Sequence, residues 1–142
     1  MAAPYTGRCL CGRVTATISG EPVAIRQCWC RQCQQIASGS PTNNAIFKSK
    51  DVDLKGELGE SAWKAASGNT LALRYCPSCG TQIYAQSSER PYLHVVRMGF
   101  LDEGHGLRPA MTIWTSEAPD WAAFHPSMEQ CAGQPGSTAP AR

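Results

Sequence analysis

The chain has 142 residues, the length of one domain, and its 13 basic and 11 acidic side chains leave a formal net charge of +2. This balance, without any run of Lys or Arg, gives no reason to expect a nucleic-acid partner. No apolar stretch is long enough to cross a membrane, and residues 1–8 hold no apolar run typical of a signal peptide. We therefore expect a cytoplasmic protein without a membrane partner, in which thiols stay reduced.

Alternating apolar and polar residues predict a chain built mainly of short strands. Residues 13–19 alternate as a half-buried strand does. Gly, Pro and Ser separate the candidates at short intervals, which is typical of an all-β domain. Short turns of helix are expected at 32–37 and 118–124. The remaining strand candidates, in chain order, are residues 23–25, 44–48, 52–57, 62–65, 71–75, 82–85, 92–96 and 111–114.

The last part of the chain differs in composition from the rest. From residue 127 onward it is rich in Gly, Pro, Ala and Ser and shows no periodicity. We expect one folded domain over residues 1–126 and a disordered tail over residues 127–142. Cys131 falls in this tail, where we expect a free thiol without a structural role.

Seven of the eight cysteines fall into three tight clusters, and these clusters predict metal sites. Disulfides are the competing interpretation, but they belong to oxidising compartments. The two cysteines of a Cys-x-Cys pair on a strand project to the same face, and Cys-x-x-Cys closed by Gly80 is typical of a metal-binding turn. The clusters are Cys9 with Cys11; Cys28 with Cys30 and Cys33; and Cys76 with Cys79.

Seven sulfurs make one set of four and one set of three. Structural zinc is normally held by four protein ligands in a tetrahedron, whereas catalytic zinc keeps one position open. The count therefore predicts two zinc sites, one for folding and one for chemistry. Zinc bound by three or four thiolates carries a net negative charge. The small positive net charge of the chain therefore disappears when both predicted zinc sites are filled.

The order of these motifs matches a known pattern. In chain order, the motifs are Cys-x-Cys-Gly, Cys-x-Cys-x-x-Cys, Gly39-Ser40, Cys-x-x-Cys-Gly-Thr, residues 113–115 and Trp121. This set resembles the glutathione-dependent formaldehyde-activating enzyme family, also called the centromere-protein-V-like family, over residues 5–125. The resemblance implies a complex fold of antiparallel sheets, shared with a small Rab exchange factor and with methionine sulfoxide reductase B. It also implies a carbon–sulfur lyase that condenses glutathione with formaldehyde to S-hydroxymethylglutathione.

The resemblance further assigns the two zinc sites. It implies that a structural zinc is held by Cys9, Cys11, Cys76 and Cys79, and that a second zinc, linked to activity, is held by Cys28, Cys30 and Cys33. The positions of the clusters in the chain agree with this assignment. A metal bound by the first and third clusters can link distant segments, while the middle cluster offers three local ligands. Three thiolates leave a metal weakly Lewis-acidic, so the open position should prefer a small thiol, such as glutathione, over activated water.

Some residues depart from the family pattern or remain unassigned. Trp29 stands where many relatives have His, and Gln34 and Gln35 stand where a basic residue is frequent. If both flanking sulfurs face the metal, Trp29 must point away from it. The cations that could meet the carboxylates of glutathione are Arg31, Lys48, Arg74, His94 and Arg97, while His94, His105 and His125 show no recognisable ligand spacing.

Two other functions remain open. The first is a zinc-stabilised binding module without catalysis. The second is a sulfoxide reductase on the same fold, which needs a nucleophilic cysteine outside the zinc sets, and Cys131 is a poor candidate.

Overall fold

The computed structural model describes residues 3–65 and 68–135 and divides into two compact units. One unit comprises Met1–Val23 and Ala45–Leu107, and the other comprises Ala24–Asn44 and Arg108–Arg142. Strand β4 (Thr42–Lys48) carries the chain from one unit to the other. In the described residues, no helix is both long and apolar enough to cross a membrane.

The first unit contains a three-stranded sheet in the order β1-β2-β5, formed by antiparallel pairing of β1 (Tyr5–Arg8), β2 (Thr15–Ile18) and β5 (Val52–Lys55). In β2, Ala16 and Ile18 are buried while the two threonines face outward, the period of two that the sequence predicts. Gly7 of β1 is required by packing, because a Cβ there would come 2.7 Å from the ring of Phe100.

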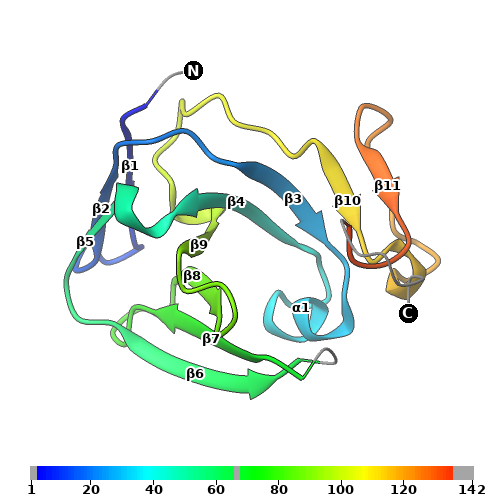
Figure 1. The fold of residues 1–142 in the computed structure, drawn as a ribbon, viewed down its shortest axis with the longest axis horizontal. Helices are drawn as coiled ribbons and strands as arrows, with labels where there is room; N and C mark the ends of the chain where they lie inside the picture. Colours follow the sequence, from blue (N-terminus) through cyan, green and yellow to red (C-terminus); the bar gives the residue numbers. More distant parts are fainter. Residues whose placement is uncertain (1–2, 66–67, 136–142) are drawn as a thin grey trace. The chain divides into compact units, whose positions relative to one another are not determined.

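The same unit contains an antiparallel meander, with strands in the order β9-β8-β7-β6 (Figure 1). Its strands are β6 (Gly59–Lys64), β7 (Thr70–Tyr75), β8 (Gln82–Ser87) and β9 (Leu93–Arg97). Two 3-10 helices also belong to the first unit: η1 (Ser49–Asp51) lies between β4 and β5, and η2 (Met98–Phe100) follows β9. The fully buried side chains of the unit include Val14, Ile18, Phe47, Ile83, Val96 and Phe100.

The second unit is built on parallel pairing. Strand β10 (Met111–Ile113) pairs in parallel with β3 (Ala24–Cys28) on one side and with β11 (Glu129–Cys131) on the other. The short helix α1 (Arg31–Ile36) follows β3, and the 3-10 helix η3 (Thr115–Glu117) follows β10. The aromatic ring of Trp29 is buried against Trp121 and Phe124, at centroid distances of 6.2 and 6.3 Å.

The mainly β character and all nine predicted strands are confirmed, and so is the helical turn predicted at 32–37, which is α1. Two details differ. Strand β1 was not predicted, because its segment contains a glycine and shows no clear alternation. Residues 118–124 form no helix, but only a turn in which the Ala122 amide donates to the Pro119 carbonyl.

The prediction of disorder from residue 127 is wrong for the described part of the tail. Residues 129–131 form β11, because the backbone of β10 supplies a parallel partner that composition cannot reveal. Hydrogen bonds from the Ser116 hydroxyl to the Ala132 carbonyl and from the Trp114 indole to Gln134 hold the segment further. Residues 136–142 lie outside the described part of the chain.

Candidate metal centres

The first group of cysteines unites two turns of the first unit. Cys9 and Cys11 lie in the loop between β1 and β2, and Cys76 and Cys79 lie in the loop between β7 and β8. All four Sγ atoms lie within 4.8 Å of one another. The structure therefore brings together the four residues expected for the structural site, although the first pair lies in a turn and not on a strand.

Two similar backbone turns place these sulfurs. The Cys9 amide donates to the carbonyl of Val14, and the Cys76 amide donates to the carbonyl of Thr81, each five residues further on. Gly12 and Gly80 take φ values of +82° and +78°, a region that residues with a Cβ rarely occupy. The Val14 amide also donates to the Cys9 sulfur at 3.2 Å, which stabilises a thiolate there.

The spacing of the sulfurs fits a tetrahedral zinc. The Sγ–Sγ distances are 3.7 Å from Cys9 to Cys11 and 3.7 Å from Cys11 to Cys76. Zn–S bonds of about 2.3 Å in a tetrahedron separate sulfurs by roughly 3.8 Å, whereas a disulfide requires about 2.05 Å. The four-cysteine set can therefore hold a zinc ion and does not form disulfides.

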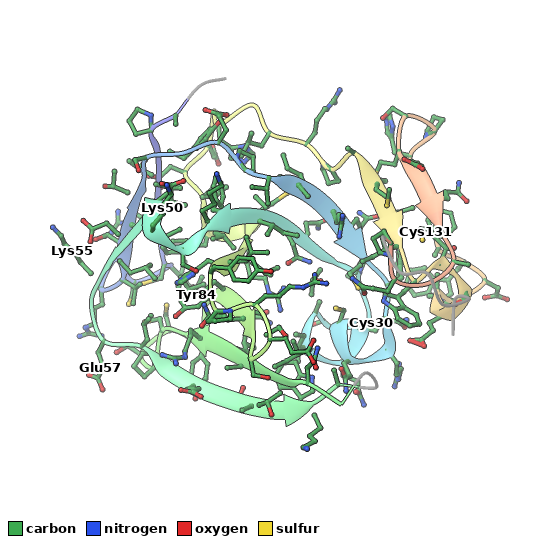
Figure 2. All side chains as sticks on the ribbon, viewed as in Figure 1. Cys30, Lys50, Lys55, Glu57, Tyr84 and Cys131 are labelled. Atoms are coloured by element: carbon green, nitrogen blue, oxygen red, sulfur yellow. The ribbon has the colours of Figure 1, made fainter. Side chains whose placement is uncertain are left out.

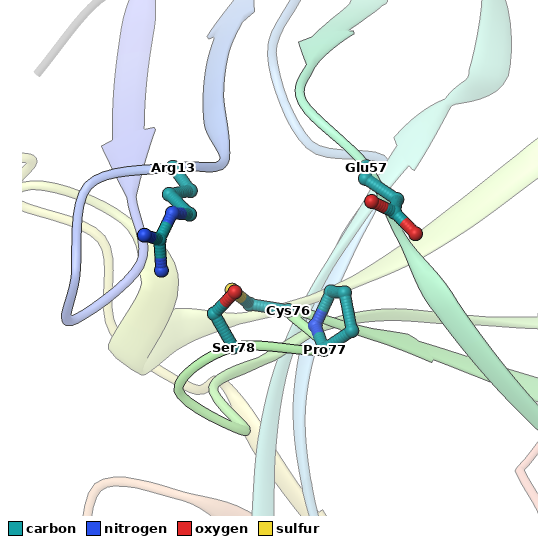
Figure 3. Close-up of a pocket in the computed structure, with 5 residues that line it drawn as sticks. All are labelled: Arg13, Glu57, Cys76, Pro77 and Ser78. Carbon is teal, nitrogen blue, oxygen red and sulfur yellow. The ribbon is translucent and has the colours of Figure 1, made fainter.

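The surroundings of the four-cysteine set favour thiolates. The Thr81 hydroxyl lies 3.2 Å from the Cys79 sulfur, and hydrogen bonds from this side chain and from the Thr81 backbone lower the pKa of Cys79 to about 5. A hollow of about 270 Å³ lies against Cys76 and is lined by Arg13, Glu57, Cys76, Pro77 and Ser78. Figure 3 shows these five residues. None of the middle cysteines lines this hollow, so it belongs to the four-cysteine site.

The second group lies entirely in the second unit, where β3 ends and α1 begins. Cys28 is the last residue of β3 and is buried, while Cys30 precedes helix α1 and Cys33 lies within it. The three Sγ atoms lie within 4.8 Å of one another, and the set has three members among the described residues. Trp29 points into the aromatic cluster, as predicted for a residue between two ligands.

Two hydrogen-bond donors reach the sulfurs of this group. The Cys33 amide donates to the Cys30 sulfur at 3.3 Å, which makes Cys30 the N-cap of helix α1. The Thr42 hydroxyl donates to the Cys33 sulfur at 3.2 Å. Hydrogen bonds with the Cys30 and Cys33 thiols, followed by burial, raise the pKa of Cys28.

The surrounding contacts fix the backbone that carries these ligands, and they involve residues that sequence reasoning missed. Buried Gln34 donates from Nε2 to the carbonyl of Trp29 at 2.7 Å and to that of Glu117 at 2.9 Å. The Glu117 carboxylate accepts from the Arg31 amide at 2.7 Å. Gln34 therefore connects the ligand segment to η3, which is a structural role.

No histidine belongs to either group among the described residues. The Nδ1 atom of His94 lies 2.8 Å from the Ser49 hydroxyl. The Nδ1 atoms of His105 and His125 each accept a hydrogen bond from the backbone amide two residues further along the chain. Of the cations considered for a substrate, Arg74 pairs with Glu60 at 3.0 Å and Arg97 donates to Gln82 at 3.0 Å.

Comparisons with known proteins agree with this arrangement. A family model described as glutathione-dependent formaldehyde-activating enzyme matches residues 4–117, which include both cysteine groups. No curated protein matches the chain. The crystal structure of a Rhodobacter sphaeroides protein is similar, with a TM-score of 0.53 and 21% sequence identity to this chain. The match covers 73% of this chain and 91% of that chain, and it supports the fold. The chain belongs to the glutathione-dependent formaldehyde-activating enzyme family.

Proposed function

We propose that the protein is a zinc-dependent carbon–sulfur lyase that interconverts a small thiol plus formaldehyde with the S-hydroxymethyl thiol, and that glutathione is the thiol. The catalytic group is the three-cysteine set of Cys28, Cys30 and Cys33. The observation that carries this proposal is the ligand count, since this set contributes three sulfurs while the other contributes four. A set of three leaves one position for a substrate.

The chain's own residues prepare the three-cysteine set for a metal. The Cys33 amide and the Thr42 hydroxyl donate to two of its sulfurs, which favours the thiolate forms that bind metal. Cys28 is buried, which limits the access of water on its side of the set. The ring of Trp29, the residue between Cys28 and Cys30, packs against the ring of Trp121.

The three thiolate ligands favour a reaction with a sulfur nucleophile. Cys28, Cys30 and Cys33 would hold the zinc, which would supply Lewis acidity that lowers the pKa of an incoming thiol at the open position. Because Cys28, Cys30 and Cys33 supply strong negative charge, they disfavour the formation of hydroxide at the same position. The three-cysteine set therefore suits a reaction that begins with a sulfur nucleophile, and suits hydrolysis poorly.

The reaction balances without a redox partner. The sulfur of the thiol forms a bond with the carbon of formaldehyde, the carbonyl electron pair moves to oxygen, and that oxygen takes up the proton that the thiol loses. The reverse direction breaks the carbon–sulfur bond and returns both reactants. Such chemistry needs reduced thiols, which places the protein in the cytoplasm under this proposal.

Exchange between free and bound formaldehyde tests the proposal. With ¹³C-formaldehyde and glutathione, zinc-loaded protein should accelerate exchange between the hydrated aldehyde and S-hydroxymethylglutathione in magnetisation-transfer NMR. The variant Cys30→Ala should lose this acceleration, while Cys131→Ser, altered outside both cysteine sets, should keep it. If zinc-loaded, folded protein leaves the exchange rate at its uncatalysed value, the lyase proposal is wrong and a binding module becomes the better account.

A further inference from the structure

Strand β6 forms an open edge of the antiparallel meander. It pairs with β7 over its whole length, and the described residues place no strand along its other side (Figure 1). β6 has six residues, whereas the edge strands β1, β5 and β11 have four, four and three. Figure 2 labels Glu57, which lies two residues before β6. An edge of this kind offers backbone N–H and C=O groups to a further strand. Its exposed residues are Glu60, Ser61, Ala62 and Lys64.

The turn between β6 and β7 shows which backbone groups face the open edge. The Ala65 amide donates to the Asn69 carbonyl at 2.8 Å, and this pair continues the β6–β7 register. Hydrogen-bonded and non-hydrogen-bonded pairs alternate along an antiparallel ladder, so Ser61 and Trp63 also direct their backbone groups toward β7. The backbone groups that point away from β7 are therefore those of Glu60, Ala62 and Lys64.

The order of charges along this edge is self-complementary. Glu60 and Lys64 lie on the same face of β6, with Ala62 midway between them. If a second copy of β6 lies antiparallel about a two-fold axis at Ala62, Glu60 of each copy is opposite Lys64 of the other. These pairs fall on hydrogen-bonded positions, because all three residues direct their backbone groups outward. A shift of the register by two residues in either direction would lose the pairing of Glu60 with Lys64.

The side chains on both faces of β6 fit this register. On one face, Arg74 contacts Glu60 with 3.0 Å between Nη2 and Oε2. A carboxylate accepts hydrogen bonds from several donors, so Glu60 can keep this pair and also accept from Lys64 of a second copy. On the other face, Ser61 would lie opposite Trp63 of the second copy, at a non-hydrogen-bonded pair where side chains approach closely. The half-buried Trp63 would then lose further exposure to water.

We propose that β6 is the interface of a homodimer, in which two copies of the chain join by antiparallel β6–β6 pairing with Glu60 opposite Lys64. A two-fold contact uses the same surface on both copies, so the open edges of both meanders are paired at once. One pair of strands buries less surface than an obligate dimer interface does, and the dimer therefore exchanges with the monomer. The interface contains no residue of either cysteine set, so it goes beyond the proposed lyase activity.

Sedimentation velocity of the full-length, zinc-loaded protein under reducing conditions tests the interface. The unaltered protein should pass from monomer to dimer over the micromolar to millimolar range. Glu60→Lys and Lys64→Glu should each weaken dimerisation roughly tenfold or more, because each places like charges opposite one another at both ends of the strand pair. Lys55→Glu, at an exposed position of β5, changes the net charge as Lys64→Glu does and should dimerise as the unaltered protein does.

An equimolar mixture of the Glu60→Lys and Lys64→Glu proteins tests the register itself. Opposite charges face one another at both ends of the mixed dimer, so the mixture should associate roughly tenfold or more tightly than either variant alone. This comparison separates pairing from any loss of stability in one variant.

Ala62→Pro tests the backbone contribution. The substitution removes an N–H that points away from β7, which an edge strand tolerates, so the protein should stay folded by circular dichroism and remain monomeric. An unaltered protein that stays monomeric throughout, a folded Ala62→Pro protein that dimerises normally, or a mixture that associates no better than its components would each refute the β6 interface. None of these measurements depends on lyase activity.

Discussion

The hydroxyl of Thr42 lies 3.2 Å from the Cys33 sulfur. The amide of Asn44 donates to the same hydroxyl oxygen at 3.0 Å, so the hydroxyl proton is left to point at the sulfur. This short chain of donors stabilises a thiolate at Cys33. It connects the first residues of β4 with the three-cysteine set, and it is local to the second unit.

Removing the Thr42 hydroxyl should weaken metal binding at the three-cysteine set. In Thr42→Val the Cys33 thiolate loses a donor, and the affinity of this set for zinc should fall by about 10–100-fold. Thr42→Ser keeps the hydroxyl and should stay close to the unaltered protein. Competition with a chromophoric chelator measures both affinities. Equal affinity in the Val and Ser variants would show that the hydroxyl does not tune the site.

Cys76→Ser should unfold the first unit. Structural zinc contributes about 10–16 kcal/mol in small peptides, which matches or exceeds the net stability of about 5–15 kcal/mol of a whole domain. Circular dichroism and metal analysis measure the loss, and Cys131→Ser is the matched control because Cys131 belongs to neither set. A Cys76→Ser protein with its melting temperature and zinc content intact would overturn the structural assignment.

Gln34→Leu should destabilise the second unit. The substitution leaves the carbonyls of Trp29 and Glu117 without their side-chain donor, which costs about 1–3 kcal/mol for buried groups. Gln35→Leu, at an exposed neighbouring position on α1, should have little effect. Urea unfolding followed by tryptophan fluorescence compares them. Similar midpoints for the two variants would argue against a structural role for Gln34.

Stability should fall at alkaline pH because of Tyr5. Its hydroxyl donates to Glu21 at 2.5 Å, and this hydrogen bond, followed by burial, raises the pKa of Tyr5 from 10.0 to about 12. The neutral phenol therefore stabilises the fold fully below pH 10, and this contribution disappears as the pH rises toward about 12. Unfolding midpoints should decline more steeply over this range in the unaltered protein than in Tyr5→Phe. Tyr92→Phe, at an exposed tyrosine, is the control, and parallel pH profiles for all three proteins would contradict the assignment.

The predictable part of the fold follows from local patterns. The alternation around Ala16 and Ile18 marks β2 because one face of that strand is buried. The cysteine spacing indicates both sulfur groups, since ligands in tight turns are close in sequence within each pair or triplet. These signals are properties of short segments, so they are readable without knowledge of the partners of each segment.

The parts that the sequence did not reveal depend on distant partners. Strand β11 forms because β10 offers a parallel edge, and nothing in Glu129-Gln130-Cys131 indicates this partner. The roles of Thr42 and Gln34 likewise depend on which sulfur or carbonyl tertiary structure places beside them. A threonine at the start of a strand and a glutamine on a short helix are common, so their hydrogen bonds become visible only in the structure.

Cobalt substitution tests most directly whether the three-cysteine set keeps a position for a thiol. Co²⁺ is loaded into the three-cysteine set, with zinc retained in the other set, and glutathione is titrated in while the cobalt–thiolate charge-transfer absorption is recorded. We predict that the absorption of the free protein reports three sulfurs and increases saturably as a fourth joins, and that Cys30→Ala abolishes this response with little loss of stability. A spectrum that already reports four sulfurs without thiol, or that responds to no thiol, would contradict the proposed open site.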